Sequence, residues 1–171
     1  MVEDDPLLRD GILALLKRQK DIQVVAASGN KENTILKIHS LKPNVVLLDL
    51  GLRSQSSLQV VKMVKKEFPA SKVIVMDIAP VPADIKQFVK AGASGFILRD
   101  VTVDEFLRTI RAVAEGEKIL PPLLPESLFA QIVEYALKSG KVKQKRYSKD
   151  GKTVDPHTPA SRPNRLKKIA A

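Results

Sequence analysis

The sequence has no cysteine and no tryptophan, and only 4% of its 171 residues are aromatic. The absence of thiols excludes disulfides, thiolate metal sites and cysteine nucleophiles, and it fits a reducing compartment. The two histidines, His39 and His157, are too far apart for a metal-binding motif. With so few aromatic residues, the hydrophobic core has to be built from aliphatic side chains.

Long hydrophobic runs are also missing. No stretch reaches the roughly 18 consecutive apolar residues of a membrane span, and we find no signal-peptide pattern. We therefore expect a cytoplasmic protein with no membrane partner. With 44% hydrophobic residues, the chain can bury one core and a small appendage.

Acidic residues become scarce only towards the C-terminus. The net charge is +10, but residues 1–138 hold 19 basic and 17 acidic residues. Residues 139–171 hold 10 basic and 2 acidic residues. The basic charge is therefore a property of the tail.

What the sequence does contain is a regular alternation of short apolar runs and helical patterns. This alternation predicts an α/β fold, a doubly wound parallel sheet with helices on both faces. We predict strands at 22–27, 45–48, 73–76 and 95–98, and helices at 6–18, 30–41, 57–68, 82–91 and from a cap at Thr102 to about Glu115.

Charged residues follow three of the predicted strands. Asp49 ends the run 45–48, Asp77 follows 73–76, and Arg99-Asp100 follows 95–98. Right-handed crossovers bring the carboxyl ends of parallel strands to one edge of the sheet. We therefore expect this edge to be the working surface, as in other open α/β sheets.

Five stretches, in order and at the family's spacing, resemble the receiver domain of bacterial response regulators of the LuxR-type, or helix-turn-helix, subfamily. They are VEDDPLLRDG (2–11), PNVVLLDLGL (43–52), KVIVMD (72–77), KAGASGFILRD (90–100) and FLRTIRAVAEGEKILPP (106–122). The resemblance implies a flavodoxin-like (CheY-like) receiver domain at 1–118 with strand order 2-1-3-4-5. It also implies a two-component phosphorelay in which a histidine kinase is the partner.

The resemblance implies site residues as well. Asp49 matches the phosphoacceptor, and Glu3 and Asp4 match the acids that hold Mg²⁺ together with Asp49 and the main-chain carbonyl of Gly51. Phe96 matches the aromatic switch position. A carboxylate is a poor nucleophile toward a phosphoryl donor unless a hard cation neutralises the developing charge. The simpler interpretations are an acidic helix start for the two acids and a core residue for Phe96.

Three features at this edge depart from the family. Asp77 stands where receivers have Ser or Thr, Arg99 stands where they have Lys, and the loop GLRSQSS (51–57) lacks the usual Pro and Gly. At an effective dielectric of ~20, a second negative charge ~4 Å from a phosphoryl group costs about 4 kcal/mol. One hypothesis is that Asp77 and Arg99 pair and hold the switch in one state without phosphate. The altered loop could also displace the carbonyl of Gly51.

The family's first strand, which belongs in the centre of the sheet, is reduced to Met1 and Val2. Losing about four buried aliphatic residues removes roughly 6–12 kcal/mol, which is comparable with the stability of a domain. Three interpretations stay open. The start of the sequence is misplaced, the fragment is only marginally stable, or the neighbouring strands close the gap. The acid pair should then lie on a fraying terminus, while the remaining strands stay parallel.

The C-terminal third is expected to have three parts: a proline-rich linker at 119–125, an amphipathic helix at 126–138, and a basic, disordered tail at 139–171 without a helix-turn-helix. The helix packs on its own receiver domain or supports a homodimer or an interdomain contact. The tail is a solvated remnant of a longer regulator, or it binds DNA weakly and nonspecifically through phosphate contacts.

Three functions of different kinds follow. The first is a receiver module, not a turnover enzyme, that switches a partner or transcriptional output when Asp49 is phosphorylated, with Arg99 as the phosphoryl partner. The second is a degenerate receiver that acts without phosphorylation, through dimerisation or protein binding. The third is nucleic-acid binding by the tail. A flavin-binding flavodoxin is disfavoured, because no hydroxyl- and glycine-rich phosphate loop follows a first strand.

Overall fold

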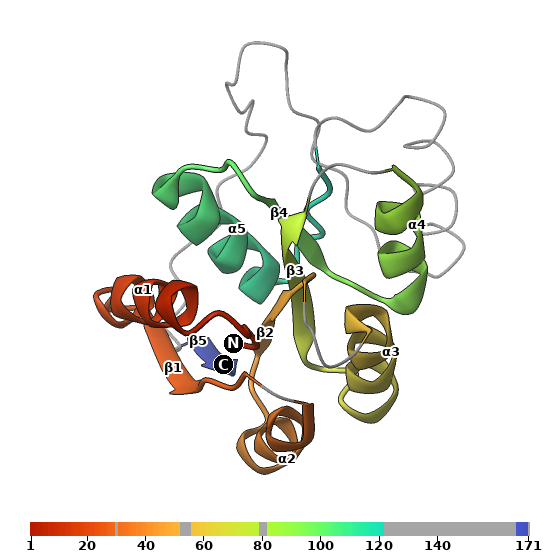
Figure 1. Ribbon diagram of the computed structural model, residues 1–171, viewed down its shortest axis with the longest axis horizontal. Helices are drawn as coiled ribbons and strands as arrows, with labels where there is room; N and C mark the ends of the chain where they lie inside the picture. The colour runs from red at the N-terminus through yellow and green to blue at the C-terminus, as the bar shows by residue number, and fades with distance from the viewer. Residues whose placement is uncertain (30, 52–55, 79–81, 122–166, 171) are drawn as a thin grey trace, which may run out of the picture.

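The computed structural model describes residues 1–29, 31–51, 56–78, 82–121 and 167–170 (Figure 1). The helices are α1 (Pro6–Lys17), α2 (Lys31–Leu41), α3 (Ser57–Glu67), α4 (Pro82–Ala91) and α5 (Val103–Glu115). The strands are β1 (Ile22–Ala26), β2 (Val45–Asp49), β3 (Lys72–Ile78), β4 (Gly95–Leu98) and β5 (Lys167–Ala170). Every helix and strand predicted before residue 116 is confirmed, with ends that differ by at most two residues. No helix in the described ranges is both long and apolar enough to cross a bilayer.

The strands form one parallel sheet in the order β1-β5-β2-β3-β4. Successive side chains of β2 point to opposite faces, and all of them are buried. Val45 and Leu47 pack in a core with α1 and α5, whereas Val46 and Leu48 pack in a second core with α2, α3 and α4. The helices thus cover both faces, as Figure 1 shows, and the predicted doubly wound α/β fold is confirmed.

Local capping explains where two of the helices begin. Asp5 caps α1, because its Oδ1 accepts hydrogen bonds from the backbone N–H of Leu7 at 2.8 Å and of Leu8 at 3.1 Å. Thr102 and Glu105 form a reciprocal capping box at the start of α5. These caps satisfy N–H groups that lack partners within the helix.

The centre of the sheet is filled in a way that the sequence did not predict. β5 pairs with β1 on one side and with β2 on the other, and so lies at the central position that the resemblance assigns to the family's first strand. The prediction of a disordered tail is therefore wrong for residues 167–170. Two rows of backbone groups face this gap, and a short extended segment satisfies both. The rest of the tail, the predicted helix 126–138 and residues 122–125 of the predicted linker lie outside the described residues.

The N-terminal residues continue the same central position. The N–H of Val2 donates to the carbonyl of Leu47 at 2.8 Å, and the N–H of Glu3 donates to the carbonyl of Ser28 at 3.0 Å. Met1 and Val2 are buried. The expected fraying terminus is therefore wrong, because these residues are hydrogen-bonded on both sides.

Candidate functional site

Asp49 is the last residue of β2, and its side chain lies at the carboxyl edge of the sheet with only 5% exposed. Its Oδ2 accepts a hydrogen bond of 2.8 Å from the N–H of Gly51. The next residue, Leu50, donates from its N–H to the carbonyl of Met76 at 3.2 Å, which ties the turn to β3. The apolar run thus ends in an acid whose carboxylate is held by its own turn.

Ser57 fixes the backbone on the far side of this turn. Its buried Oγ lies 2.8 Å from the carbonyl of Asp49 and 3.0 Å from that of Leu50, within hydrogen-bond distance of both. Sequence reasoning missed this role, although a serine at the start of a predicted helix is a recognisable signal. The displacement of the Gly51 carbonyl stays a prediction, because residues 52–55 of this loop lie outside the described ranges.

Glu3 brings a second carboxylate to the edge, and it is 3% exposed. Its Oε1 accepts a 2.9 Å hydrogen bond from the N–H of Asp5, while its Oε2 is buried and has no hydrogen-bond partner among the described residues. Burial raises the pKa of Glu3, and the carboxylates of Asp49, Asp5 and Asp4 raise it further, against the effect of the Asp5 hydrogen bond. The predicted acids are thus electrostatic neighbours.

Arg9 supports the backbone of this acidic stretch. Its Nη1 donates to the carbonyl of Glu3 at 3.1 Å. A Cβ at position 29 would lie 3.0 Å from that Nη1, so glycine leaves room for the arginine. Sequence reasoning missed Arg9 as well, because no sequence pattern indicates that the arginine of α1 turns back to the carbonyl of Glu3 six residues earlier.

The remaining predicted residues lie on the neighbouring strands. Met76 is opposite Asp49 in the register of β2 and β3, so the backbone of Asp77 lies one residue further along this edge, but its side chain is not described. Arg99 follows β4 and is exposed. Their pairing stays a prediction. Phe96 is 4% exposed and packs in the core with α3 and α4, which agrees with the simpler interpretation.

The donor set suits a hard divalent cation. Glu3, Asp4 and Asp49 offer carboxylate oxygens, which are the ligands that Mg²⁺ prefers. The buried Oε2 of Glu3 lacks a hydrogen-bond donor among the described residues and would gain a partner in a cation. Within the described ranges, however, no three acidic or histidine side chains already meet closely enough to form a metal-binding group. The acids would have to draw together around the ion.

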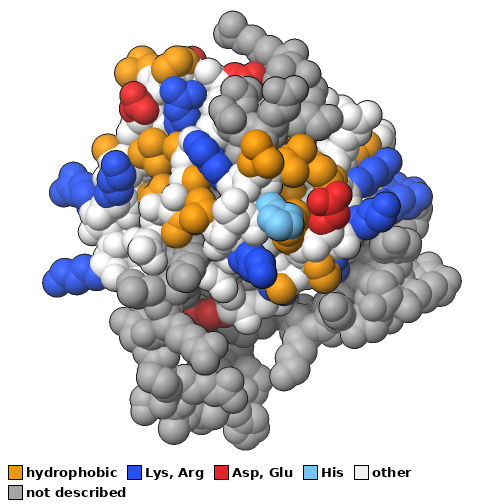
Figure 2. Space-filling view, turned by 90° about the horizontal axis from the view of Figure 1, so that it is seen from below, with side chains coloured by type: hydrophobic (Ala, Val, Ile, Leu, Met, Phe, Trp, Pro, Cys, Tyr) orange, Lys and Arg blue, Asp and Glu red, His pale blue; other side chains and the backbone are white. Residues whose placement is uncertain are grey.

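Basic side chains do not form one continuous stripe across the face that Figure 2 shows. Lys and Arg side chains of the described residues gather at the two edges of this view, and hydrophobic and uncharged groups lie across most of the middle. Nucleic-acid binding usually uses a contiguous basic stripe. The predicted DNA contact of the tail concerns side chains that are not described.

Comparisons with known proteins agree with this geometry. The family model described as "Response regulator receiver domain" matches residues 1–111. The nitrate/nitrite response regulator protein NarL of Escherichia coli (strain K12) is 28% identical over 132 residues, which cover 77% of this chain and 61% of NarL. This chain thus matches less than two thirds of the length of that relative.

Solved structures of LuxR-family response regulators share the fold. One, a two-component response regulator from Aurantimonas sp. SI85-9A1, gives a TM-score of 0.67 at 21% identity and covers 80% of this chain and 94% of that one. Another, a DNA-binding response regulator from Staphylococcus aureus, gives a TM-score of 0.61 at 26% identity, with coverages of 66% and 94%.

Proposed function

We propose that this chain, which belongs to the response regulator receiver domain family, accepts a phosphoryl group on Asp49 from a histidine kinase and so switches a partner or a transcriptional output. The observation that carries the proposal is the place of Asp49. It is buried at the carboxyl end of β2, held by the N–H of Gly51 and next to the acidic Glu3. Relatives of the chain are response regulators of the LuxR family.

The proposed step transfers a phosphoryl group without any oxidation or reduction. A carboxylate oxygen of Asp49 attacks the phosphorus of the kinase phosphohistidine, and the bond between phosphorus and the imidazole nitrogen breaks. The electron pair stays on the imidazole nitrogen, and the product is an aspartyl phosphate. Burial favours the reaction because few water molecules compete for the phosphorus.

The acids beside Asp49 would serve this step by holding Mg²⁺, with Glu3, Asp4, Asp49 and the carbonyl of Gly51 as ligands. A bound Mg²⁺ neutralises the negative charge that develops on the phosphoryl oxygens. Arg99, after β4, would supply a positive charge from the chain itself. The backbone hydrogen bonds of Val2 with Leu47 and Asp49 hold the acidic stretch against β2 before any ion arrives, and the side chain of Arg9 holds the carbonyl of Glu3.

Two observations favour a second function, that of a receiver which acts without phosphate through dimerisation or protein binding. The described acids do not already form a metal-binding group. Asp77, next along β3 from the residue opposite Asp49, also brings a carboxylate where the family uses a hydroxyl donor. An ionised carboxylate cannot donate a hydrogen bond to a phosphoryl oxygen.

Acetyl phosphate with Mg²⁺ separates the two functions. We expect the chain to gain the mass of one phosphoryl group and Asp49→Asn to gain none. Asp77→Thr should lengthen the lifetime of the phosphorylated form, because it removes a negative charge and restores a donor. Labelling that survives in Asp49→Asn would overturn the assignment. Absence of labelling in both the parent chain and Asp77→Thr, together with no Mg²⁺-dependent response to beryllium fluoride, would favour the phosphate-independent function.

A further inference from the structure

The central strand of the sheet is built from both ends of the chain. β5 lies between β1 and β2, and Ala170 is opposite Ala26 on one side and Val46 on the other. The N and C marks lie next to each other in Figure 1. Residues far apart in the sequence thus meet in the middle of the fold.

The N-terminal residues continue this strand in register. Val2 is opposite Ser28 on the β1 side and Leu48 on the β2 side, each two residues beyond the partners of Ala170. Met1 precedes Val2 in line with β5, and its carbonyl accepts a 3.0 Å hydrogen bond from the N–H of Ser28. Residues 167–170 and 1–3 therefore act together as one parallel strand in two pieces.

This position cannot stay empty without cost. With β5 and residues 1–3 in the gap, every residue of β2 is buried. An empty gap would leave the N–H and C=O groups that β1 and β2 direct towards it without partners in the protein. A segment that enters the gap in extended form satisfies both rows at once, as β5 does.

The gap is also coupled to the candidate site. The N–H of Asp49 donates to the carbonyl of Val2 at 2.9 Å, so the place of Asp49 depends on residues 1–3 lying in the gap. Residues 1–3 alone fill only part of the gap between β1 and β2. β5 fills the rest of it and pairs with both strands.

We propose that the gap between β1 and β2 is a binding site for an extended peptide segment, that residues 167–170 of the same chain occupy it, and that this occupation holds residues 1–3 beside Asp49. The ligand is a short parallel strand, and its recognition is mainly through backbone hydrogen bonds. The proposal does not depend on phosphorylation of Asp49. Its tests therefore read strand pairing directly.

Cross-linking tests which segment fills the gap. The chain has no cysteine, so an engineered pair provides the only thiols. Gln23 and Lys168 are register partners, and Gln23 is exposed. On oxidation, Gln23→Cys with Lys168→Cys should form a disulfide within one chain. Gln23→Cys with Lys167→Cys is the control and should cross-link at least about tenfold less, because neighbouring strand residues point to opposite faces.

Amide hydrogen exchange tests the coupling. Deletion of 167–171 should reduce protection of β1 amides and of the Ser28 and Asp49 amides at least about tenfold, since their partners leave the gap. Deletion of 139–143 removes the same number of residues and of lysines and should change nothing. A synthetic peptide of residues 161–171, added to the shortened chain, should restore protection.

Each outcome decides the proposal. Disulfides that link two chains would show a second copy in the gap, and equal cross-linking in both pairs would show no defined register; either result would overturn it. Unchanged protection after deletion of 167–171 would do the same. If that deletion unfolds the whole chain, the added peptide must restore the fold, and its failure to do so would count against the site. A failure of the intact chain to become phosphorylated would contradict only the proposed function and would leave the peptide-binding gap untouched.

Discussion

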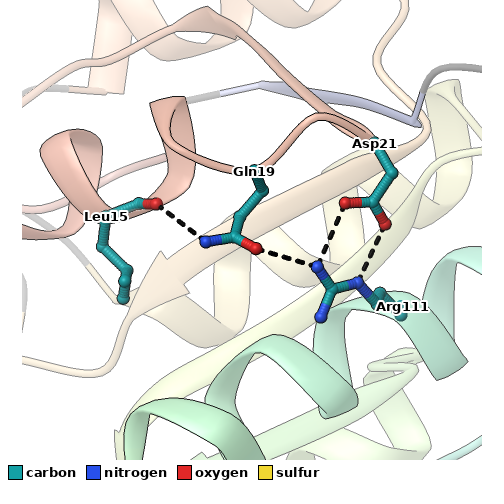
Figure 3. Close-up of polar contacts among 4 residues, drawn as sticks. All are labelled: Leu15, Gln19, Asp21 and Arg111. Atoms are coloured by element: carbon teal, nitrogen blue, oxygen red, sulfur yellow. Dashed lines mark hydrogen bonds and ion pairs between the residues drawn. The ribbon is translucent and has the colours of Figure 1, made fainter.

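Arg111 holds Asp21 through two hydrogen bonds although ninety residues separate them in the sequence. The Nε of Arg111 lies 2.8 Å from one carboxylate oxygen, and its Nη2 lies 3.0 Å from the other. The same Nη2 donates to the side chain of Gln19 at 3.0 Å (Figure 3). This contact joins α5 to the turn between α1 and β1, on the face of the sheet that both helices cover.

Replacing Arg111 should weaken that connection. We expect Arg111→Ala to lower the free energy of unfolding by about 1 kcal/mol, because the pair is bidentate but partly exposed. Arg111→Lys should recover roughly half of the loss, since lysine cannot present the planar fork. Urea denaturation measures both. Arg108→Ala on the exposed side of the same helix is the control, and an equal loss there would show that the contact with Asp21 contributes nothing specific.

Gly95 should not tolerate a larger residue. A Cβ at this position of β4 would lie 2.7 Å from Cγ2 of Val113 on α5. We expect Gly95→Ala to destabilise the fold by about 1–3 kcal/mol, because the helix must move away from the sheet. Gly11→Ala is the matched control, since a Cβ there meets nothing within 4 Å and should stabilise α1 by about 0.5–1 kcal/mol. Thermal unfolding measures both variants. Changes of the same sign in the two unfolding temperatures would contradict this account of the packing at Gly95.

The capping box of α5 should make stability depend on acid pH. The Oε2 of Glu105 accepts hydrogen bonds from the N–H of Thr102 at 3.2 Å and from its Oγ1 at 3.1 Å, and these bonds lower the pKa of Glu105. Because the folded state has the lower pKa, this stabilisation is present above the ordinary carboxyl pKa and disappears as pH falls through the lowered value. Thr102→Ala should cost about 1 kcal/mol at neutral pH.

The measurement for the capping box is urea denaturation at neutral and acid pH. The difference between Thr102→Ala and the parent chain should shrink as the solution is acidified. Asp104→Asn, in the same helical turn, removes a carboxylate other than that of Glu105 and so shows how much pH dependence a single charge at the start of α5 contributes. A difference that stays constant with pH would show that Glu105 plays no part in the cap.

The ionised carboxylate of Glu3 should lower the stability of the folded state at neutral pH. Burial raises its pKa, and the charges of Asp49, Asp5 and Asp4 raise it further. A raised folded-state pKa gives stability that is complete below the unfolded value and is lost as pH rises through the folded value. Glu3→Gln should therefore raise the unfolding temperature at neutral pH and change it little in acid.

The same substitution should weaken Mg²⁺ binding, because it removes a proposed ligand. Isothermal titration with Mg²⁺ measures that loss, and Glu67→Gln, at an exposed position of α3, controls for removal of one acid. A lower unfolding temperature for Glu3→Gln at neutral pH would contradict the electrostatic account of this site.

Local sequence patterns were enough to place the helices and strands up to residue 116, and Asp49 at the end of β2. Apolar runs such as 45–48 and helical periodicity such as that of 57–68 are local signals, so their positions could be predicted closely. The resemblance to response regulator receivers indicated Glu3, Asp4 and Asp49 as site residues. The fold places Glu3 close enough to Asp49 for their charges to interact. Phe96 lies in the core, in agreement with the simpler interpretation of a phenylalanine in a strand.

The segment that completes the sheet and the residues that support the site could be found only from contacts in the folded chain. Residues 167–170 contain two lysines and belong to a basic tail, so no local pattern predicts a central strand there. Strand pairing depends on two rows of backbone groups that come together from distant parts of the chain. The contacts of Ser57 and Arg9 join residues that are close in the sequence, yet each is a hydrogen bond to a backbone carbonyl whose position is set only by the folded chain.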